Sequence, residues 1–224
     1  MNLIMFDLDG TLIDTQALIV ETMAGAFGSL GLVPPGPAEV RAIIGLALPI
    51  AIGQLAGSDD VDLIEGLVGQ YKSLYRTALE SGLDREPLYP GARAALDRLR
   101  SRPDTLLGVA TGKGLSGVVR ILGNHGLAEH FVTVQTPDHN PSKPHPGMLL
   151  RAMAETGVDA NDTVMVGDTV FDMELAAAAR TRSVGVRWGY HDTGALLEAG
   201  AGALIHAYDQ LDAAVDLVLG RSHA

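Results

Sequence analysis

Two carboxylates follow directly after a short apolar run near the start of the chain. Residues 2–6 are mostly apolar, and Asp7, Asp9, Gly10 and Thr11 come next. An apolar run of this length that ends near a glycine is typical of a strand buried on both faces of a parallel sheet, where ligands bind just beyond the carboxyl ends of the strands. Two buried like charges repel and lose hydration unless a cation or a shared proton compensates them. The segment predicts a metal site, with an ordinary Asp and Gly turn as the alternative.

A hydroxyl and a flexible turn follow a second apolar run, at Thr111, Gly112 and Lys113. Such a turn can hold a phosphate through Oγ and backbone N–H groups at the start of a helix. A Walker loop is excluded because the spacing from Gly108 to Lys113 is one residue too short and Gly114 stands where Ser or Thr is required. A plain turn remains the alternative at this segment.

A lysine in a stiff segment is the third candidate. Lys143 comes directly before Pro144, and Pro146 follows after His145; the prolines restrict the backbone ahead of an expected helix. An ammonium fixed in this way can neutralise the charge of a phosphate. His139 and His145 are nearby, but their irregular spacing and the absence of cysteine argue against a zinc site.

The fourth candidate is another strand-end pair of acids. Residues 163–166 are mostly apolar, and Gly167, Asp168 and Asp172 follow. If a helix begins near Thr169, Asp172 lies one turn into it and faces back toward Asp168. Helix capping explains one acid, but it does not explain a second pair of strand-end acids in the same chain.

The region from 15 to about 85 has no convincing strand pattern. Helical spacing is found at 15–30, and four prolines and glycines at 34–37 interrupt it. The clearest helix is expected at 61–79 after the acidic start at Asp59 and Asp60. Its apolar stripe, interpreted as core, consists of Val61, Ile64, Val68, Tyr71, Tyr75 and Leu79.

Beyond Pro90 the pattern changes to strands that alternate with helices. Strands are predicted at 106–110, 131–134, 163–166, 183–186 and 203–205, and helices at 92–100, 115–125, 148–155, 173–179 and 195–199. This order predicts an α/β fold, a doubly wound Rossmann-like parallel sheet with helices on both faces. An all-helical cap domain at 15–87 is then inserted into a core domain of residues 1–14 and 88–224.

Composition restricts the classes of partner. The 224 residues are 47% apolar and 19% charged, which is typical of a globular chain. A net charge of −11, with 16 Lys and Arg against 27 Asp and Glu, argues against nucleic acid as the main partner. The absence of cysteine excludes disulfides, thiolate zinc sites and cysteine nucleophiles. With no signal sequence or membrane-length apolar run, we expect a soluble cytoplasmic protein, a monomer or homodimer.

Taken together, the four segments resemble the haloacid dehalogenase-like hydrolase superfamily in their order and context. The resemblance covers residues 1 to about 190, and the helical region resembles the small cap of that superfamily. The segment Trp-Gly-Tyr-His-Asp at 188–192 resembles one found in the phosphoglycolate phosphatase branch. The expected partner is therefore a small phosphate ester.

This resemblance implies a role for each acid. Asp7 is expected to attack phosphorus and form an aspartyl-phosphate, while Asp9 protonates the leaving oxygen and then deprotonates water. The implied cofactor is Mg²⁺, bound by Asp7, by the backbone carbonyl of Asp9 and by Asp168, with Asp172 supporting it from behind.

The resemblance also implies how the phosphate is held. Expected contacts are the backbone N–H groups of Leu8, Asp9, Gly10 and Thr11, together with Thr111, Gly112 and Lys143. From the cap, Arg41 and Gly45 are expected to contribute to substrate specificity.

Several reactions remain open within and outside this superfamily. An acid at Asp9 favours phosphate esters over halide or phosphonate substrates, and Thr11 favours hydrolysis over a β-phosphoglucomutase-like transfer. The preferred substrate is 2-phosphoglycolate, with sugar phosphates and pyrophosphate as alternatives. Non-enzymatic alternatives are a phosphoacceptor signalling module, whose first acids would be adjacent rather than separated by one residue, and an inactive ligand-binding protein.

Overall fold

Strands and helices alternate along most of the chain. The computed structural model describes residues 1–80 and 85–221, and within them six strands form one parallel sheet in the order β3-β2-β1-β4-β5-β6. The strands are β1 (Asn2–Phe6), β2 (Thr105–Ala110), β3 (Thr133–Gln135), β4 (Thr163–Gly167), β5 (Arg182–Val186) and β6 (Ala203–Ile205). The predicted doubly wound α/β fold is confirmed.

The order of the strands reverses at β1, and this reversal positions the site. β1 lies between β2 and β4, and Phe6 is in register with Val109 of β2 and Val166 of β4. The three strands therefore end at the same edge of the sheet. Connections leave such a reversal in opposite directions and open a crevice at the strands' carboxyl ends.

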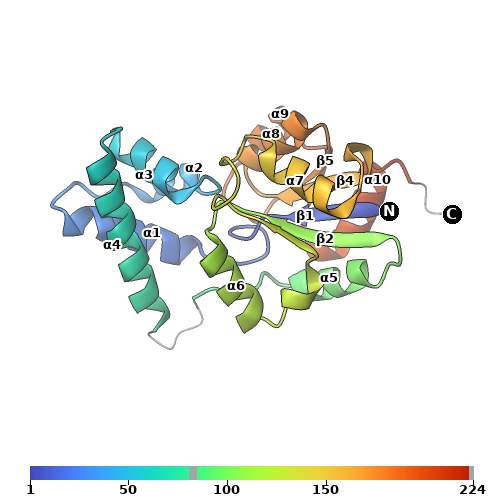
Figure 1. Cartoon of the computed structure of the whole chain (residues 1–224), viewed down its shortest axis with the longest axis horizontal. Coiled ribbons are helices and arrows are strands. Elements are labelled where there is room, and N and C mark those ends of the chain that lie inside the picture. Colours follow the sequence, from blue (N-terminus) through green and yellow to red (C-terminus); the bar gives the residue numbers. More distant parts are fainter. Residues whose placement is uncertain (81–84, 222–224) are drawn as a thin grey trace.

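Alternation along β1 divides the core between two layers of helices. Ile4 and Phe6 belong to an apolar cluster with α5 (Ala92–Arg100), α6 (Leu115–Asn124) and α10 (Leu211–Val218). Leu3 and Met5 belong to a second cluster with α7 (Gly147–Thr156) and α8 (Val170–Ala179). Because successive strand side chains point to opposite faces, one fully buried strand contributes to both layers. Figure 1 shows α7 and α8 on one side of the sheet and α5 and α6 on the other.

A separate helical unit lies beyond one end of the sheet (Figure 1). It consists of α1 (Gln16–Ser29), α2 (Pro37–Ile43), α3 (Leu48–Ala56) and α4 (Val61–Leu79), which share an apolar cluster of their own. Asp60 caps α4, since its carboxylate accepts hydrogen bonds from the N–H groups of Asp62 (3.0 Å) and Leu63 (3.3 Å). The all-helical insertion is confirmed, and we call this unit the cap. The division at 15–87 and 88–224 stays a prediction, and its parts at 81–84 and 222–224 lie outside the described residues.

Several helices and strands begin at residues other than those expected from the sequence. The strand expected at 131–134 begins only at Thr133, the helix expected from 173 begins at Val170, and the helix α10 was not predicted. The short helix α9 (Thr193–Glu198) begins two residues before the start expected from the sequence. On α4, Val61 is 65% exposed, whereas Leu67, absent from the predicted stripe, is buried. None of the described helices has the length and apolar character needed to cross a membrane.

Substituting a cap residue tests whether the cap is a separate folding unit. Ile52 is fully buried in the cap cluster, and Ile52→Ala should destabilise the cap by about 2–5 kcal/mol because a cavity replaces the side chain. Hydrogen exchange should then quicken in α1–α4 while the amides of β1, β2 and β4 stay protected. Ile50→Ala, an exposed neighbour on the same helix, is the matched control. Equal loss of protection in the sheet would contradict a separate cap domain.

Candidate active site

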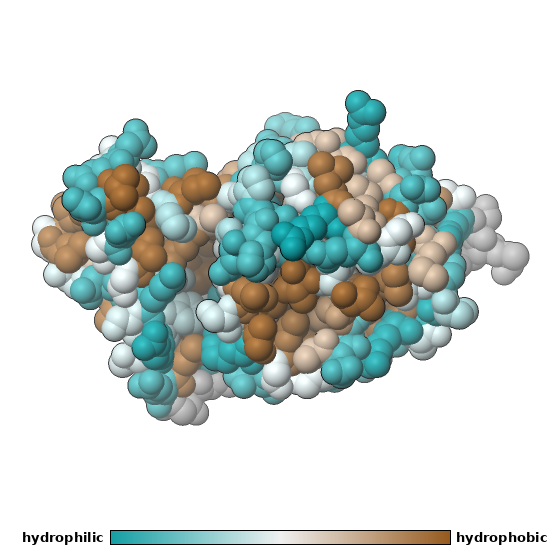
Figure 2. Space-filling model, viewed as in Figure 1, coloured by the Kyte–Doolittle hydropathy of each residue, from teal (hydrophilic) through white to brown (hydrophobic). Residues whose placement is uncertain are grey.

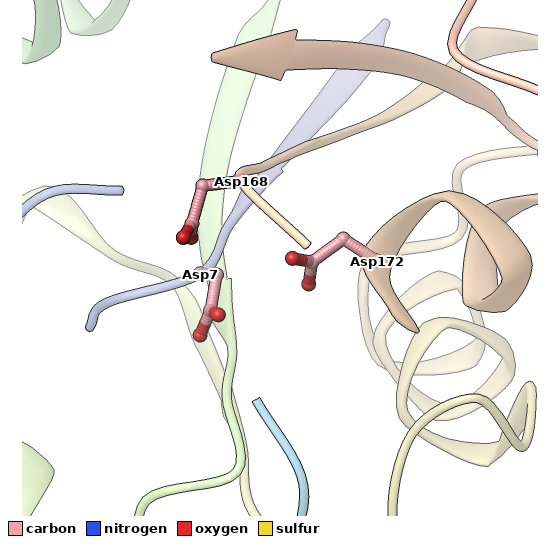
Figure 3. A group of neighbouring side chains, drawn as sticks. All are labelled: Asp7, Asp168 and Asp172. Atoms are coloured by element: carbon pink, nitrogen blue, oxygen red, sulfur yellow. The ribbon is translucent and has the colours of Figure 1, made fainter. Parts of the chain in front are cut away.

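Three buried carboxylates meet at the carboxyl ends of β1 and β4. Asp7 follows β1, Asp168 follows β4, and Asp172 lies in the first turn of α8. Figure 3 shows the three side chains projecting from these elements into one small region. Each offers an oxygen within 4.8 Å of the oxygens of the other two. We call Asp7, Asp168 and Asp172 the acid cluster; such a group of carboxylate oxygens can hold a metal ion.

Lys143 supplies a positive charge within hydrogen-bond range of the acid cluster. Its Nζ lies 2.6 Å from Oδ1 of Asp172 and 3.1 Å from Oδ1 of Asp7. Burial disfavours the ammonium, but the charges of Asp172 and Asp7 outweigh this effect and raise the pKa of Lys143. The structure therefore brings together Lys143 and three of the four strand-end acids selected from the sequence, Asp7, Asp168 and Asp172.

Asp7 has one oxygen that the rest of the described protein does not bind. Its Oδ1 accepts the N–H of Leu8 at 2.7 Å, whereas its buried Oδ2 has no hydrogen-bond partner among the described residues. Burial raises the pKa of Asp7 to about 7; Lys143 opposes this rise, and Asp172 and Asp9 add to it. An unpaired buried carboxylate oxygen is costly, so this atom is suited to bind a cation or to attack an electrophile.

The other two acids are held by donors that orient them. Oδ1 of Asp168 accepts the hydroxyl of Thr11 (2.8 Å), and Oδ2 accepts the N–H of Tyr190 (2.9 Å). Burial, followed by the charges of Asp172 and Asp7, raises the pKa of Asp168. Oδ2 of Asp172 accepts both the N–H (3.0 Å) and the hydroxyl (2.7 Å) of Thr169. With its other oxygen on Lys143, Asp172 fits a supporting position behind the metal better than direct ligation.

The side chain of Asp9 takes a different direction. Its Oδ1 accepts the hydroxyl of Thr15 at 2.6 Å, and its Oδ2 lies 3.2 Å from Nζ of Lys113. The Asp9 carboxylate is therefore not part of the acid cluster. Metal binding through the backbone carbonyl of Asp9 and proton transfer by its carboxyl stay predictions.

The loop after β1 is a tight turn in which most N–H groups have internal acceptors. The N–H of Gly10 donates to Ile13 (2.9 Å) and that of Thr11 donates to Leu8 (3.2 Å), while Leu8 donates to Asp7. Phosphate binding by Leu8, Gly10 and Thr11 stays a prediction. Gly10 is required here because its φ is +83° and a Cβ would lie 2.3 Å from Oδ2 of Asp168.

Cap residues 44–47 contact three of the loops that carry the candidate residues. A Cβ on Gly112 would lie 2.5 Å from the carbonyl oxygens of both Gly45 and Leu46, so only glycine allows this approach. The N–H of Ala47 donates to Oγ of Ser142 at 2.8 Å, next to Lys143. A Cβ on Gly45 would lie 3.1 Å from Oγ1 of Thr169. Gly45 therefore touches the site by packing of its backbone, and its contribution to substrate specificity stays a prediction.

A cavity of about 1180 Å³ lies between the cap and the core. Asp7, Asp9 and Thr111 line its core side, and apolar side chains such as Met23 and Leu48 line its cap side. Figure 2 shows the surface hollowed where the two units meet. Arg41, expected to contribute to specificity, does not line this cavity. The volume is large enough to hold a phosphate ester together with its leaving group.

Residues 188–192 form hydrogen bonds with the segments that carry the site residues. The indole N–H of Trp188 donates to the carbonyl of Thr11 (3.1 Å), and the hydroxyl of Tyr190 lies 3.2 Å from that of Thr15. Together with the bond from Tyr190 to Asp168, these contacts give the segment a structural role. From the sequence this segment carried only a resemblance, and Lys113 was part of the second candidate turn with no role of its own. Two aromatics separated by glycine directly after a strand were the available signal.

Comparison with known proteins assigns the chain to a family. The family model described as haloacid dehalogenase-like hydrolase matches residues 4–186. The chain belongs to the haloacid dehalogenase-like hydrolases. All four segments selected from the sequence fall inside the matched region, and so does the cap.

Individual curated proteins and solved structures resemble this chain over most of its length. The probable phosphatase IndB of Dickeya dadantii (strain 3937) is 36% identical, covering 99% of this chain and 94% of that protein. A phosphoglycolate phosphatase of Vibrio parahaemolyticus is 32% identical over 85% of each chain. The crystal structure of a hydrolase from Pseudomonas syringae has a TM-score of 0.86 at 23% identity, covering 99% of this chain and 100% of the other, and supports the fold.

We expect Mg²⁺ to stabilise this haloacid dehalogenase-like hydrolase more strongly as the pH rises. A carboxyl whose pKa is raised by folding stabilises the protein fully below its ordinary value of 3.8, and this contribution is lost as the pH rises through the folded value, about 7 for Asp7. A metal binds the deprotonated acids, so it compensates this loss.

The measurement is the gain in Tm on adding saturating Mg²⁺, which should be larger at about pH 8 than at about pH 5.5. Asp168→Asn serves as the control, because it removes one charge from the acid cluster without changing its volume. A gain of equal size at both pH values, or an undiminished gain in the variant, would contradict metal binding at the acid cluster.

Proposed function

We propose that this hydrolase is a Mg²⁺-dependent phosphatase that cleaves small phosphate monoesters through an aspartyl-phosphate on Asp7. The observation that carries the proposal is the buried, unpaired Oδ2 of Asp7, a residue that belongs to the acid cluster, pairs with Lys143 through Oδ1 and lines the cavity. A carboxylate is a competent nucleophile toward phosphorus when positive charge screens its repulsion from the phosphate. Lys143 supplies one such charge from within the core.

In the first step, an oxygen of Asp7 attacks phosphorus while the bond from phosphorus to the ester oxygen breaks. Asp9 gives its proton to that oxygen, and the alcohol leaves. In the second step, Asp9 takes a proton from water as the water oxygen attacks phosphorus, and the bond to Asp7 breaks. The products are inorganic phosphate and the regenerated carboxylate. Asp9 suits this role because it borders the cavity and its carboxylate is separate from the acid cluster.

Asp7, Asp168 and the backbone carbonyl of Asp9 would hold the metal, with Asp172 behind them. When bound, Mg²⁺ supplies positive charge against the phosphoryl oxygens. Two observations support this fit. The acid cluster offers carboxylate oxygens that lie within 4.8 Å of one another, and Oδ2 of Asp7 has no hydrogen-bond partner among the described residues. Thr111, buried at the end of β2 and lining the cavity, is proposed to donate its hydroxyl to the phosphate.

The substrate we propose first is 2-phosphoglycolate. Support comes from residues 188–192 and from relatives that are named phosphoglycolate phosphatase. Another relative is named only as a probable phosphatase, and the cavity has room for larger leaving groups. Sugar phosphates and pyrophosphate therefore belong in the same test.

The test is phosphate release from 2-phosphoglycolate, glucose phosphates, pyrophosphate and p-nitrophenyl phosphate, each with Mg²⁺ and with EDTA. We expect turnover that EDTA stops and Mg²⁺ restores, with the highest kcat/KM for 2-phosphoglycolate. Equal kcat/KM for all the esters would support the phosphatase chemistry and contradict the substrate. Turnover that persists in EDTA would contradict the role of the acid cluster.

Asp7→Asn should abolish turnover while the fold remains intact. The substitution keeps the size of the side chain and replaces the carboxylate by an uncharged, poorly nucleophilic amide, so we expect kcat to fall by at least about 1,000-fold. Asp14→Asn, an exposed acid close in the sequence, is the matched control and should retain activity. Circular dichroism establishes that both variants fold, and retained turnover in Asp7→Asn would contradict the covalent route.

A further inference from the structure

A row of polar contacts connects Asp9 with the cap. Nζ of Lys113 lies 3.2 Å from Oδ2 of Asp9 and 3.4 Å from the hydroxyl oxygen of Tyr75, and it lies over the tyrosine ring, 5.0 Å from its centroid. The hydroxyl of Tyr75 donates to Oε1 of Glu86 at 2.6 Å. Lys113 follows β2 in the core, Tyr75 lies on α4, and Glu86 lies in the connection that returns from the cap. We call Lys113, Tyr75 and Glu86 the relay.

Glu86 anchors the cap side of the relay to the core. Both of its carboxylate oxygens pair with the guanidinium of Arg120 on α6, one of them at 2.9 Å. Burial raises the pKa of Glu86, but the hydrogen bonds from Arg120 and Tyr75 and the charge of Lys113 lower it below its ordinary value. Glu86 therefore stays ionised and accepts a hydrogen bond from the Tyr75 hydroxyl, so the Tyr75 oxygen can present a lone pair to Lys113.

Asp9 is restrained from two directions. Thr15, directly before α1, binds its Oδ1, and Lys113 binds its Oδ2. Asp9 is 8% exposed, Tyr75 8% and Glu86 6%, so water competes little for these contacts. Lys113 also contacts Tyr75 of α4, so the position of α4 determines how Lys113 holds Oδ2 of Asp9. Asp9, the relay and Arg120 all line the cavity that would receive the substrate.

We propose that Lys113 and Tyr75 are positioning residues that hold the carboxyl of Asp9 for proton transfer while α4 lies against the core. This inference rests on the proposed phosphatase function and adds a link between cap position and chemistry. Without Lys113, Oδ2 of Asp9 loses its partner and the side chain rotates. Proton transfer is sensitive to such rotation, because displacement of a catalytic group by about 1 Å can reduce the rate about 100-fold.

Proton transfer has a signature that a purely structural role lacks. When Asp7 attacks, the ester oxygen takes the proton of Asp9 as its bond to phosphorus breaks. An alkoxide is a poor leaving group and needs this proton, whereas p-nitrophenolate departs without it. A misplaced Asp9 should therefore slow alkyl esters far more than p-nitrophenyl phosphate. The quantity to compare is kcat/KM, which reports on steps through phosphoryl transfer to Asp7 and not on later hydrolysis.

The experiment measures kcat/KM of the full-length chain with Mg²⁺ on 2-phenylethyl phosphate and on p-nitrophenyl phosphate. In Tyr75→Phe, we expect a loss on the alkyl ester about 10-fold greater than on the aryl ester, and in Lys113→Met one about 100-fold greater. Lys113→Arg keeps the charge and should recover most of the difference. Tyr71→Phe is the matched control: its ring packs against Tyr75 with centroids 5.7 Å apart, but its hydroxyl is not part of the relay.

Equal losses on the two esters in Tyr75→Phe and Lys113→Met would overturn the inference, as would a leaving-group effect of the same size in Tyr71→Phe. If Lys113→Met does not fold, Tyr75→Phe and Lys113→Arg decide the matter, because both keep nearly the original volume. Wild-type protein that releases phosphate from neither ester nor from 2-phosphoglycolate would overturn the proposed function itself. That result is obtained before any variant is compared, so the two failures are distinguishable.

Discussion

A buried excess of negative charge at the carboxyl ends of β1 and β4 is the constraint on which this structure depends. Three carboxylates of the acid cluster face one ammonium, that of Lys143, and leave a formal charge of −2 when all are ionised. Buried charges of this kind are costly unless they are paired and hydrogen-bonded. Donors from Thr11, Thr169 and Tyr190 reduce this cost, and a divalent cation would neutralise what remains. The same charges make the site suited to phosphoryl chemistry.

The cap and the core contribute different parts of the site. The core positions the acid cluster, since Asp7 and Asp168 follow buried strands and Asp172 lies in the first turn of α8; Lys143 is buried in the connection from β3 to α7. Asp9 faces the other way, toward Lys113 and the cap. Close packing of Gly45 against Gly112 brings the two parts together without any side chain between them. In our account the nucleophile needs only the core, whereas the proton donor depends on the position of the cap.

Much of this arrangement could be predicted from the sequence, and the rest could not, for physical reasons. Asp7 and Asp168 were found because parallel strands end at one edge of a sheet, so strand-end acids must converge. The relay was missed because contacts among Tyr75, Glu86 and Lys113 depend on how the cap lies on the core, which no local pattern encodes. The helix α10 was missed although Leu211, Ala214, Val215 and Val218 recur at helical spacing. Val61 was wrongly assigned to the core because it starts α4 on its exposed side.

Trapping the covalent intermediate tests the central claim most directly. Protein mixed with substrate and Mg²⁺ is quenched with sodium borohydride, which reduces an aspartyl-phosphate to homoserine, and the peptide that contains residue 7 is sequenced by mass spectrometry. Our account predicts homoserine at position 7 only when substrate is present, and none at the position of Asp9. Phosphate release without reduction at position 7, or with reduction at another acid, would contradict Asp7 as the nucleophile.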